Sequence, residues 1–230
     1  RVDEERIPIA FKKLEGALLE IVRKYNYENF IMLIKSAGFI SPNLINSKNA
    51  LNFAYSLYLR LRQDSDLSEG ERKRIARRWF VLSMLTGRHS GSFESRWEQD
   101  IRRIGDQGAA AYLKHLEETE LSDAFWTATL PANLQTTSTT SPYFQVFQAA
   151  QIAAGSRGFL SKHITVATME EHSGDTHHIV PKDYLQKNGF PDRTDYNQVA
   201  NFVRTETSIN IKISNLPPRD YLGLVDNQIE

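Results

Sequence analysis

The sequence predicts an α+β protein in two parts: a mainly α-helical domain over residues 1–155 and a small domain of short strands and helix over residues 156–230. In most of the first part, apolar residues recur at spacings of three and four, as on the buried face of a helix. After Gly155 and Gly158, β-branched residues gather in short runs instead. Before this change, a polar run over residues 136–142 (TTSTTSP) is typical of a surface loop between packed units.

The helices of the first part follow from this spacing. One or two amphipathic helices are expected between residue 9 and Gly38, where the glycine supplies a stop. Ser95 and Glu98 have the spacing of a capping box, although Ser92 competes with Ser95 as the cap. The same apolar pattern predicts further helices over residues 51–61, 68–86, 92–104, 109–116 and 143–154.

Three short segments of the second part have the composition of strands. Residues 163–169 (HITVATM) are rich in β-branched side chains, residues 177–181 (HHIVP) end in proline, and residues 201–206 (NFVRTE) alternate apolar with polar side chains. We therefore expect short strands mixed with helix in the last 70 or so residues.

Composition limits the classes of protein to which the chain can belong. Of the 230 residues, 40% are hydrophobic, which is enough for a buried core, and no run is long and apolar enough to predict a membrane span. The chain has no cysteine, so His, Asp, Glu, Asn or backbone oxygen must hold any metal, and a reducing cytoplasm fits. Lys plus Arg equals Asp plus Glu at 28 each, so a nucleic-acid surface has to be a local patch.

One local basic cluster lies in the helix predicted over residues 68–86. Its members are Arg72, Lys73, Arg74, Arg77 and Arg78. Positions 74, 77 and 78 share a helix face that could follow a phosphate backbone. The alternative is a solvated helix face whose charge is offset by the many nearby glutamates.

The histidines are concentrated in the second part, where four of the six lie within sixteen residues: His163, His172, His177 and His178. Asn201 stands before a strand-like run, and Asn210 follows nine residues later at the start of a predicted helix. The order along the chain is therefore two histidines, a proline, an asparagine, a strand, and an asparagine on a helix.

This order resembles the His-Asn-His (HNH), or ββα-metal, nuclease motif, and the spacing of the two asparagines matches HNH domains of RNA-guided DNA nucleases. The segments THHIVPK, NQVANFV and SINIKISN, with RHSGSFESRWEQDIRRI before them, resemble the C-terminal half of GmrSD-type modification-dependent restriction endonucleases. The resemblance implies a small ββα-metal nuclease domain over residues 156–230 after the helical domain.

The resemblance also implies a function and partners. The expected function is metal-dependent hydrolysis of DNA, with base-modified DNA as the substrate, in a restriction or phage-defence system. Proteins of this group carry an N-terminal nucleotide-hydrolysing domain that is not among these residues, so we expect the chain to be a piece of a longer one.

Each residue of the motif has a role by this resemblance. His178 aligns with the general base, His177 and Asn210 with the metal ligands, and Asn201 with a residue that orients the loop bearing the base. These residue types suit the chemistry, because a neutral imidazole accepts a proton near neutral pH and a divalent cation offsets the charge that builds up on the phosphate. Asn201 fits equally well as an ordinary turn or strand-start residue.

The expected cofactor is one divalent ion. Two protein ligands leave room for water and phosphate oxygen, which favours Mg²⁺ or Mn²⁺, although an imidazole ligand also suits Zn²⁺ or Ni²⁺. Lys182, Arg204 and Lys212 are candidates for contact with DNA phosphates, or else ordinary solvated cations. Asp175 is an alternative to His177 as a ligand, or an additional one.

Two features of the sequence depart from this scheme. Adjacent residues on a regular strand point to opposite faces, so His177 and His178 can meet one ion only if the strand is distorted. The long segment over residues 184–196 also separates the proline from the first asparagine run. The rival hypotheses are a noncatalytic DNA-binding or scaffold module with a degenerate HNH frame, and a purely structural metal site.

Overall fold

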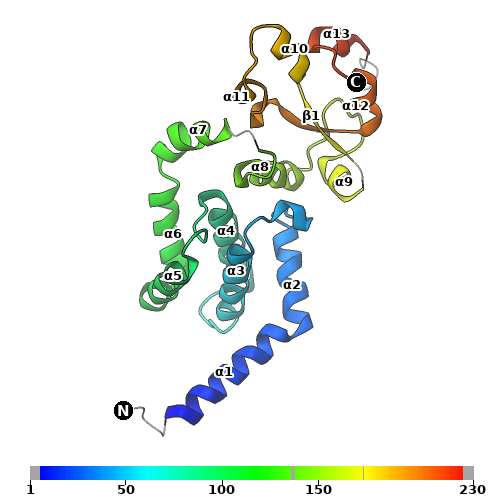
Figure 1. Cartoon of the computed structure of the whole chain (residues 1–230). Coiled ribbons are helices and arrows are strands. Elements are labelled where there is room, and N and C mark those ends of the chain that lie inside the picture. The colour runs from blue at the N-terminus through cyan, green and yellow to red at the C-terminus, as the bar shows by residue number, and fades with distance from the viewer. Residues whose placement is uncertain (1–5, 136–137, 173, 225–230) are drawn as a thin grey trace.

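The computed structural model describes residues 6–135, 138–172 and 174–224, and helices dominate it (Figure 1). The elements in chain order are α1 (Arg6–Val22), α2 (Lys24–Lys35), η1 (Pro42–Leu44), α3 (Lys48–Leu61), α4 (Glu69–Thr86), α5 (Phe93–Gln107), α6 (Ala109–Glu120), the π-helical turn η2 (Phe125–Thr129), α7 (Leu130–Leu134), α8 (Pro142–Ala153), α9 (Val166–Glu171), β1 (Asp175–His178), α10 (Lys182–Lys187), α11 (Arg193–Tyr196), η3 (Val199–Asn201), β2 (Phe202–Thr205), α12 (Thr207–Ile213), α13 (Pro218–Tyr221) and η4 (Leu222–Leu224).

The predicted α+β class, with a helical domain followed by a small ββα-metal domain, is wrong. The structure is 68% helical, and the sheet in its described residues consists of two short antiparallel strands. Residues 163–169, expected as a strand, run into helix α9 because the Thr165 hydroxyl accepts a hydrogen bond from the Thr168 amide and caps the helix. The long segment between the two strands forms the short helices α10 and α11.

Serines set several helix starts in the N-terminal part. Ser47 accepts a hydrogen bond from the Ala50 amide at the start of α3, and Ser68 forms a reciprocal capping box with Glu71 at the start of α4. The capping box expected at Ser95 does not form, because α5 already begins at Phe93 and Ser95 lies inside it. The helices predicted over residues 51–61, 68–86 and 109–116 are confirmed, with shifts of a few residues at their ends.

The main hydrophobic core lies between α2, α3, α4 and α6. Trp79 and Phe80 of α4 are completely buried in it, and Phe39 packs edge-on against Phe80 with 4.9 Å between ring centroids. In contrast, α1 extends away from this core (Figure 1) and leaves apolar side chains such as Phe11 and Leu14 exposed. Among the described residues, no helix combines the length and the apolar character needed to cross a membrane.

A buried polar network ties α5 and α6 to the end of α4. The Arg88 Nε donates a hydrogen bond to the Asp100 Oδ2 over 3.0 Å, and the same guanidinium contacts Glu120 and the Tyr112 hydroxyl. Asp100, which is fully buried, also accepts a hydrogen bond from the Tyr112 hydroxyl and faces the His89 Nε2 at 3.1 Å. These hydrogen bonds compensate the carboxylate for the water it has lost.

Helix α8 packs on both parts of the chain and lies between them in Figure 1. On one side its Ala149 belongs to the main core and touches Gly38, whose φ is +91°. On the other side its Phe144 meets Phe202 of β2 edge-on, with 5.5 Å between ring centroids. The domain boundary predicted at residue 155 stays a prediction. Of the loop expected over residues 136–142, residues 136 and 137 lie outside the described residues.

Candidate active site

The candidate site is built on β1, β2 and the helix that follows them. The strands pair antiparallel, with His177 opposite Val203 and His178 opposite Phe202. The Ile179 amide extends the ladder by donating to the Asn201 carbonyl over 2.9 Å. The strand pair is therefore regular through both histidines, and the distortion that the sequence required is not present.

Asn201 holds together the two segments that flank the insertion between the strands. Its Oδ1 accepts a hydrogen bond from the Val180 amide over 2.8 Å, and its Nδ2 donates to the Val180 carbonyl over 3.0 Å. The same Nδ2 donates to the Tyr196 carbonyl over 2.9 Å. These are the contacts expected of a residue that orients the loop after the histidines, while its part in catalysis stays a prediction.

His177, which is buried, lies in a cluster with the half-buried Asn210 and Asp175. Its side chain is 8% exposed, and its Nε2 has no hydrogen-bond partner within the described part of the chain. The Asn210 Nδ2, from α12, donates to the Asp175 Oδ2 over 2.9 Å. Burial lowers the pKa of His177 below its usual value, against the opposing effects of the nearby Asn210 side chain and of the charge on Asp175. The neutral imidazole, whose lone pair can bind a metal, is therefore the favoured form.

His178 has different neighbours. Its Nε2 lies 2.8 Å from the Asn197 Oδ1, and its ring packs edge-on against Phe202 with 5.1 Å between centroids. Because an amide oxygen only accepts hydrogen bonds, Nε2 carries the proton and Nδ1 holds the lone pair of the neutral ring. Since adjacent strand residues point to opposite faces, His177 and His178 do not converge on one point in this strand pair.

The three basic residues predicted to contact phosphate have different surroundings. Arg204 is 15% exposed and pairs with Glu170 of α9 at 3.3 Å, so its charge is compensated inside the protein. Lys182 is exposed at the start of α10, and its Nζ lies 5.3 Å from the centre of the Tyr196 ring. Lys212 is exposed in the last turn of α12. Contact with DNA stays a prediction for all three.

The donors at His177 fit a divalent cation that accepts both nitrogen and oxygen. The buried Nε2 without a partner is one ligand, and the Asn210 amide oxygen and the Asp175 carboxylate supply oxygen beside it. No group of three or more His, Cys, Asp or Glu side chains within the described residues could hold a metal ion. The cluster at His177 contains two such side chains, His177 and Asp175, and its third donor is the Asn210 amide.

Sequence reasoning singled out most of this cluster but missed Asn197. The sequence indicates Asp175 as an alternative or assisting ligand. The hydrogen bond that Asp175 accepts from Asn210 places Asp175 in the cluster with His177. Asn197 lies at the end of the insertion, and no spacing in the sequence relates it to His178.

Comparison of the chain with protein-family models, with curated proteins and with solved structures gives no match.

Proposed function

We propose that the chain hydrolyses DNA phosphodiester bonds with the help of one divalent cation held by His177 and Asn210. The observation that supports the proposal best is the buried, neutral imidazole of His177, whose Nε2 has no partner within the described residues, next to an amide and a carboxylate. Burying such a nitrogen without a partner costs free energy, and a metal ligand role gives a reason for that cost.

Each residue of the cluster has a proposed task. His177 and Asn210 hold the cation, which would stabilise the negative charge on the phosphate and on the leaving oxygen. Asp175 orients the Asn210 amide through their hydrogen bond. His178 accepts the proton of the attacking water at Nδ1, since its Nε2 is engaged with Asn197. Mg²⁺ or Mn²⁺ is the proposed ion, with Zn²⁺ or Ni²⁺ as alternatives because of the imidazole ligand.

The cationic side chains divide into two groups under this proposal. Lys182 and Lys212, both exposed, would contact DNA phosphates on either side of the site. Arg204 holds β2 to α9 through Glu170 and would contribute to stability. Base-modified DNA as the substrate, a place in restriction or phage defence, and an N-terminal nucleotide-hydrolysing partner domain follow from the sequence resemblance alone and belong to the same proposal.

A second candidate function is a noncatalytic DNA-binding or scaffold module. The observation that favours it is the regular strand pairing, which directs His177 and His178 to opposite faces, whereas a base and a metal ligand must act on the same phosphate. A structural metal site is a variant of this alternative, in which metal binding raises the melting temperature of the protein and no cleavage occurs.

Metal-dependent nicking of supercoiled plasmid distinguishes these functions. The chain should nick DNA with Mn²⁺ or Mg²⁺ and not after chelation, and Asn210→Ala should lose both nicking and metal binding. Asn188→Ala is the matched control, because Asn188 is exposed and, among the residues that the structure describes, its side chain bonds only to the Tyr184 carbonyl. Absence of nicking by a folded chain that binds metal would leave the structural site as the function.

A further inference from the structure

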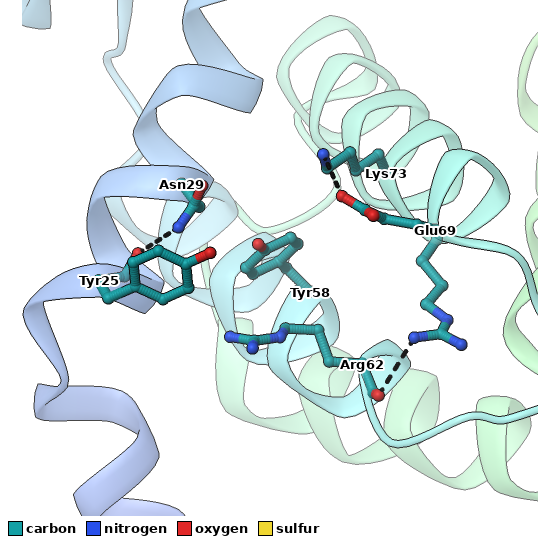
Figure 2. A pocket seen from close by; sticks show the side chains of 7 residues that line it. Tyr25, Asn29, Tyr58, Arg62, Glu69 and Lys73 are labelled. Atoms are coloured by element: carbon teal, nitrogen blue, oxygen red, sulfur yellow. Dashed lines mark hydrogen bonds and ion pairs between the residues drawn. The ribbon is translucent and has the colours of Figure 1, made fainter.

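A polar cavity lies in the N-terminal helical part, away from the His177 cluster. It has a volume of about 310 Å³ and is lined by Tyr25, Asn29, Tyr58, Arg62, Glu69, Arg72 and Lys73. The lining residues come from α2, from the end of α3 and from the first turns of α4, and six of them are labelled in Figure 2. Since none of them belongs to the candidate active site, the cavity needs an explanation of its own.

The cavity carries excess positive charge. Lys73 is paired with Glu69 at 2.5 Å, so the guanidinium groups of Arg62 and Arg72 supply the remaining positive charge. Arg62 donates to the Asn26 amide oxygen, while Arg72 donates to the backbone carbonyls of Leu67 and Arg62. Within the described ranges, neither guanidinium forms an ion pair with a carboxylate, although the hydrogen bond from Lys73 and, to a lesser degree, the charges of both arginines lower the pKa of Glu69. One carboxylate faces three cationic side chains in the lining, so the cavity keeps a net positive charge for an anion.

Two aromatic rings complete the cavity. Tyr58 of α3 is 6% exposed and forms part of the floor, whereas Tyr25 of α2 is 65% exposed and borders the opening. Figure 2 shows both rings with Arg62 beside them and the Glu69–Lys73 pair across the cavity. A large exposed aromatic ring next to arginines, such as that of Tyr25, is typical of surfaces on which nucleic-acid bases stack.

We propose that this cavity binds a nucleotide, with its phosphate against Arg62 and Arg72 and its base against Tyr25 and Tyr58. The volume is at the lower end of the range for small-ligand sites and exceeds what a single phosphate fills. A free nucleotide and a nucleotide within a single DNA strand offer the same chemistry. Of the basic cluster predicted over residues 72–78, Arg72 and Lys73 line this cavity. Arg78 does not, and it is paired with Glu117 at 2.6 Å.

Calorimetric titration of the full chain tests the proposal with four probes: deoxyadenosine monophosphate, deoxyadenosine, inorganic phosphate and a short single-stranded oligodeoxyadenylate. The monophosphate should bind on the order of tenfold more tightly than phosphate or nucleoside alone, because only it uses both the arginines and the rings. Tighter binding of the oligonucleotide, weakened by salt, would identify a DNA strand as the ligand, and equal or weaker binding a free nucleotide. Absence of binding by both would overturn the proposal.

Variants locate the binding. Arg72→Gln and Tyr25→Leu should each weaken binding of the monophosphate on the order of tenfold or more. Arg74→Gln is the matched control, because Arg74 is exposed on the same helix and does not line the cavity. Tyr25 is so exposed that its replacement should leave folding intact, which circular dichroism would verify. Equal losses in Arg72→Gln and Arg74→Gln, or none in Tyr25→Leu, would contradict the assignment. Asn210→Ala should bind the monophosphate normally, whatever becomes of the nuclease proposal.

Discussion

His177 and His178 are neighbours in sequence but occupy different environments. One is buried beside Asn210 with a lowered pKa, and the other is half-buried and bonded to Asn197. The proposed roles, ligand and base, follow this difference. A ligand needs a neutral nitrogen without a competing proton donor, whereas a base needs a partner that fixes which nitrogen carries the proton.

Substitution of each histidine separates the two roles. His178→Ala should keep most of the metal affinity and lose on the order of 10² to 10⁴ in cleavage rate, because the coordination shell stays intact. His177→Ala should weaken metal binding, and excess metal should restore part of the activity. Calorimetric metal titration and plasmid nicking measure both quantities. Equal metal affinities in the two variants, or normal cleavage by His178→Ala, would show that the roles are assigned wrongly.

Asp100 should make stability depend on pH in the acid range. Burial alone raises the pKa of Asp100, but hydrogen bonds from His89 and Arg88 outweigh it and hold the pKa below its usual value. The unfolded carboxyl binds its proton near pH 3.9, so this contribution to stability is present above that pH and is lost as pH falls towards the folded pKa. Asp100→Asn should therefore be less stable at neutral pH and depend less on pH below about 4.

Urea unfolding between pH 7 and pH 2.5 measures this effect. The control is Asp106→Asn, since Asp106 is exposed on the same helix. A pH dependence of Asp100→Asn equal to that of the unchanged chain would count against the network as its source.

Single residues of the site were predictable only where spacing carried information. The sequence singles out His177 and Asn210 through the resemblance of the residue order to the HNH motif, and the structure has them on β1 and α12. Asn197 could not be singled out, because it meets His178 across an insertion whose path depends on tertiary packing. Nor could the pairing of Arg204 with Glu170 be foreseen, since it depends on α9 being a helix.

Among the elements, helices were easier to predict than strands. Residues 68–86 have both an apolar stripe and a capping serine, and the structure has helix α4 over Glu69–Thr86. The β-branched residues 163–169 favour a strand by composition, yet the Thr165 cap and burial of Val166 and Met169 produce helix α9. In such a short segment, tertiary packing outweighs intrinsic propensity, and this explains why the predicted α+β class was wrong.

The contact between α8 and the segment that follows α2 requires a residue without a side chain at position 38. A β-carbon at Gly38 would overlap the Ala149 carbonyl oxygen, and φ at Gly38 is +91°. Gly38→Ala should therefore destabilise the protein by roughly 1–3 kcal/mol through the forced backbone shift, in addition to about 1–2 kcal/mol for the positive φ. Gly155→Ala is the control, because Gly155 also has a positive φ but a β-carbon there meets nothing within 4 Å.

Chemical unfolding of both glycine variants measures the difference. Gly155→Ala should lose only the conformational cost of about 1–2 kcal/mol. If Gly38→Ala proved no less stable than Gly155→Ala, the close approach of α2 to α8 would be wrong.

In the molecule as a whole, α8 should keep the two parts together even when the chain is cut before it. Ser138, Thr139 and Thr140 precede α8, and the last two are exposed, so a protease site can replace them. After cleavage there, the fragments should still elute together in size-exclusion chromatography, because Ala149 stays packed in the main core. Separation of the fragments without denaturant would instead show that α8 belongs with the second part, with the domain boundary before α8 and not at residue 155.

The position of α8 also has a consequence for folding kinetics. Its Phe144 and Ala149 belong to two clusters that include residues from distant stretches of the chain, such as Phe39 and Phe202. Contacts between residues so far apart in sequence close large loops, which slows the step that forms them. The N-terminal helices can therefore pack together early. Docking of α8 and of the strand pair is the later step, because it joins segments that are far apart in sequence. Refolding followed by stopped-flow fluorescence should show the slow phase lengthen in Phe144→Leu, because that variant weakens the contact on which the late step depends.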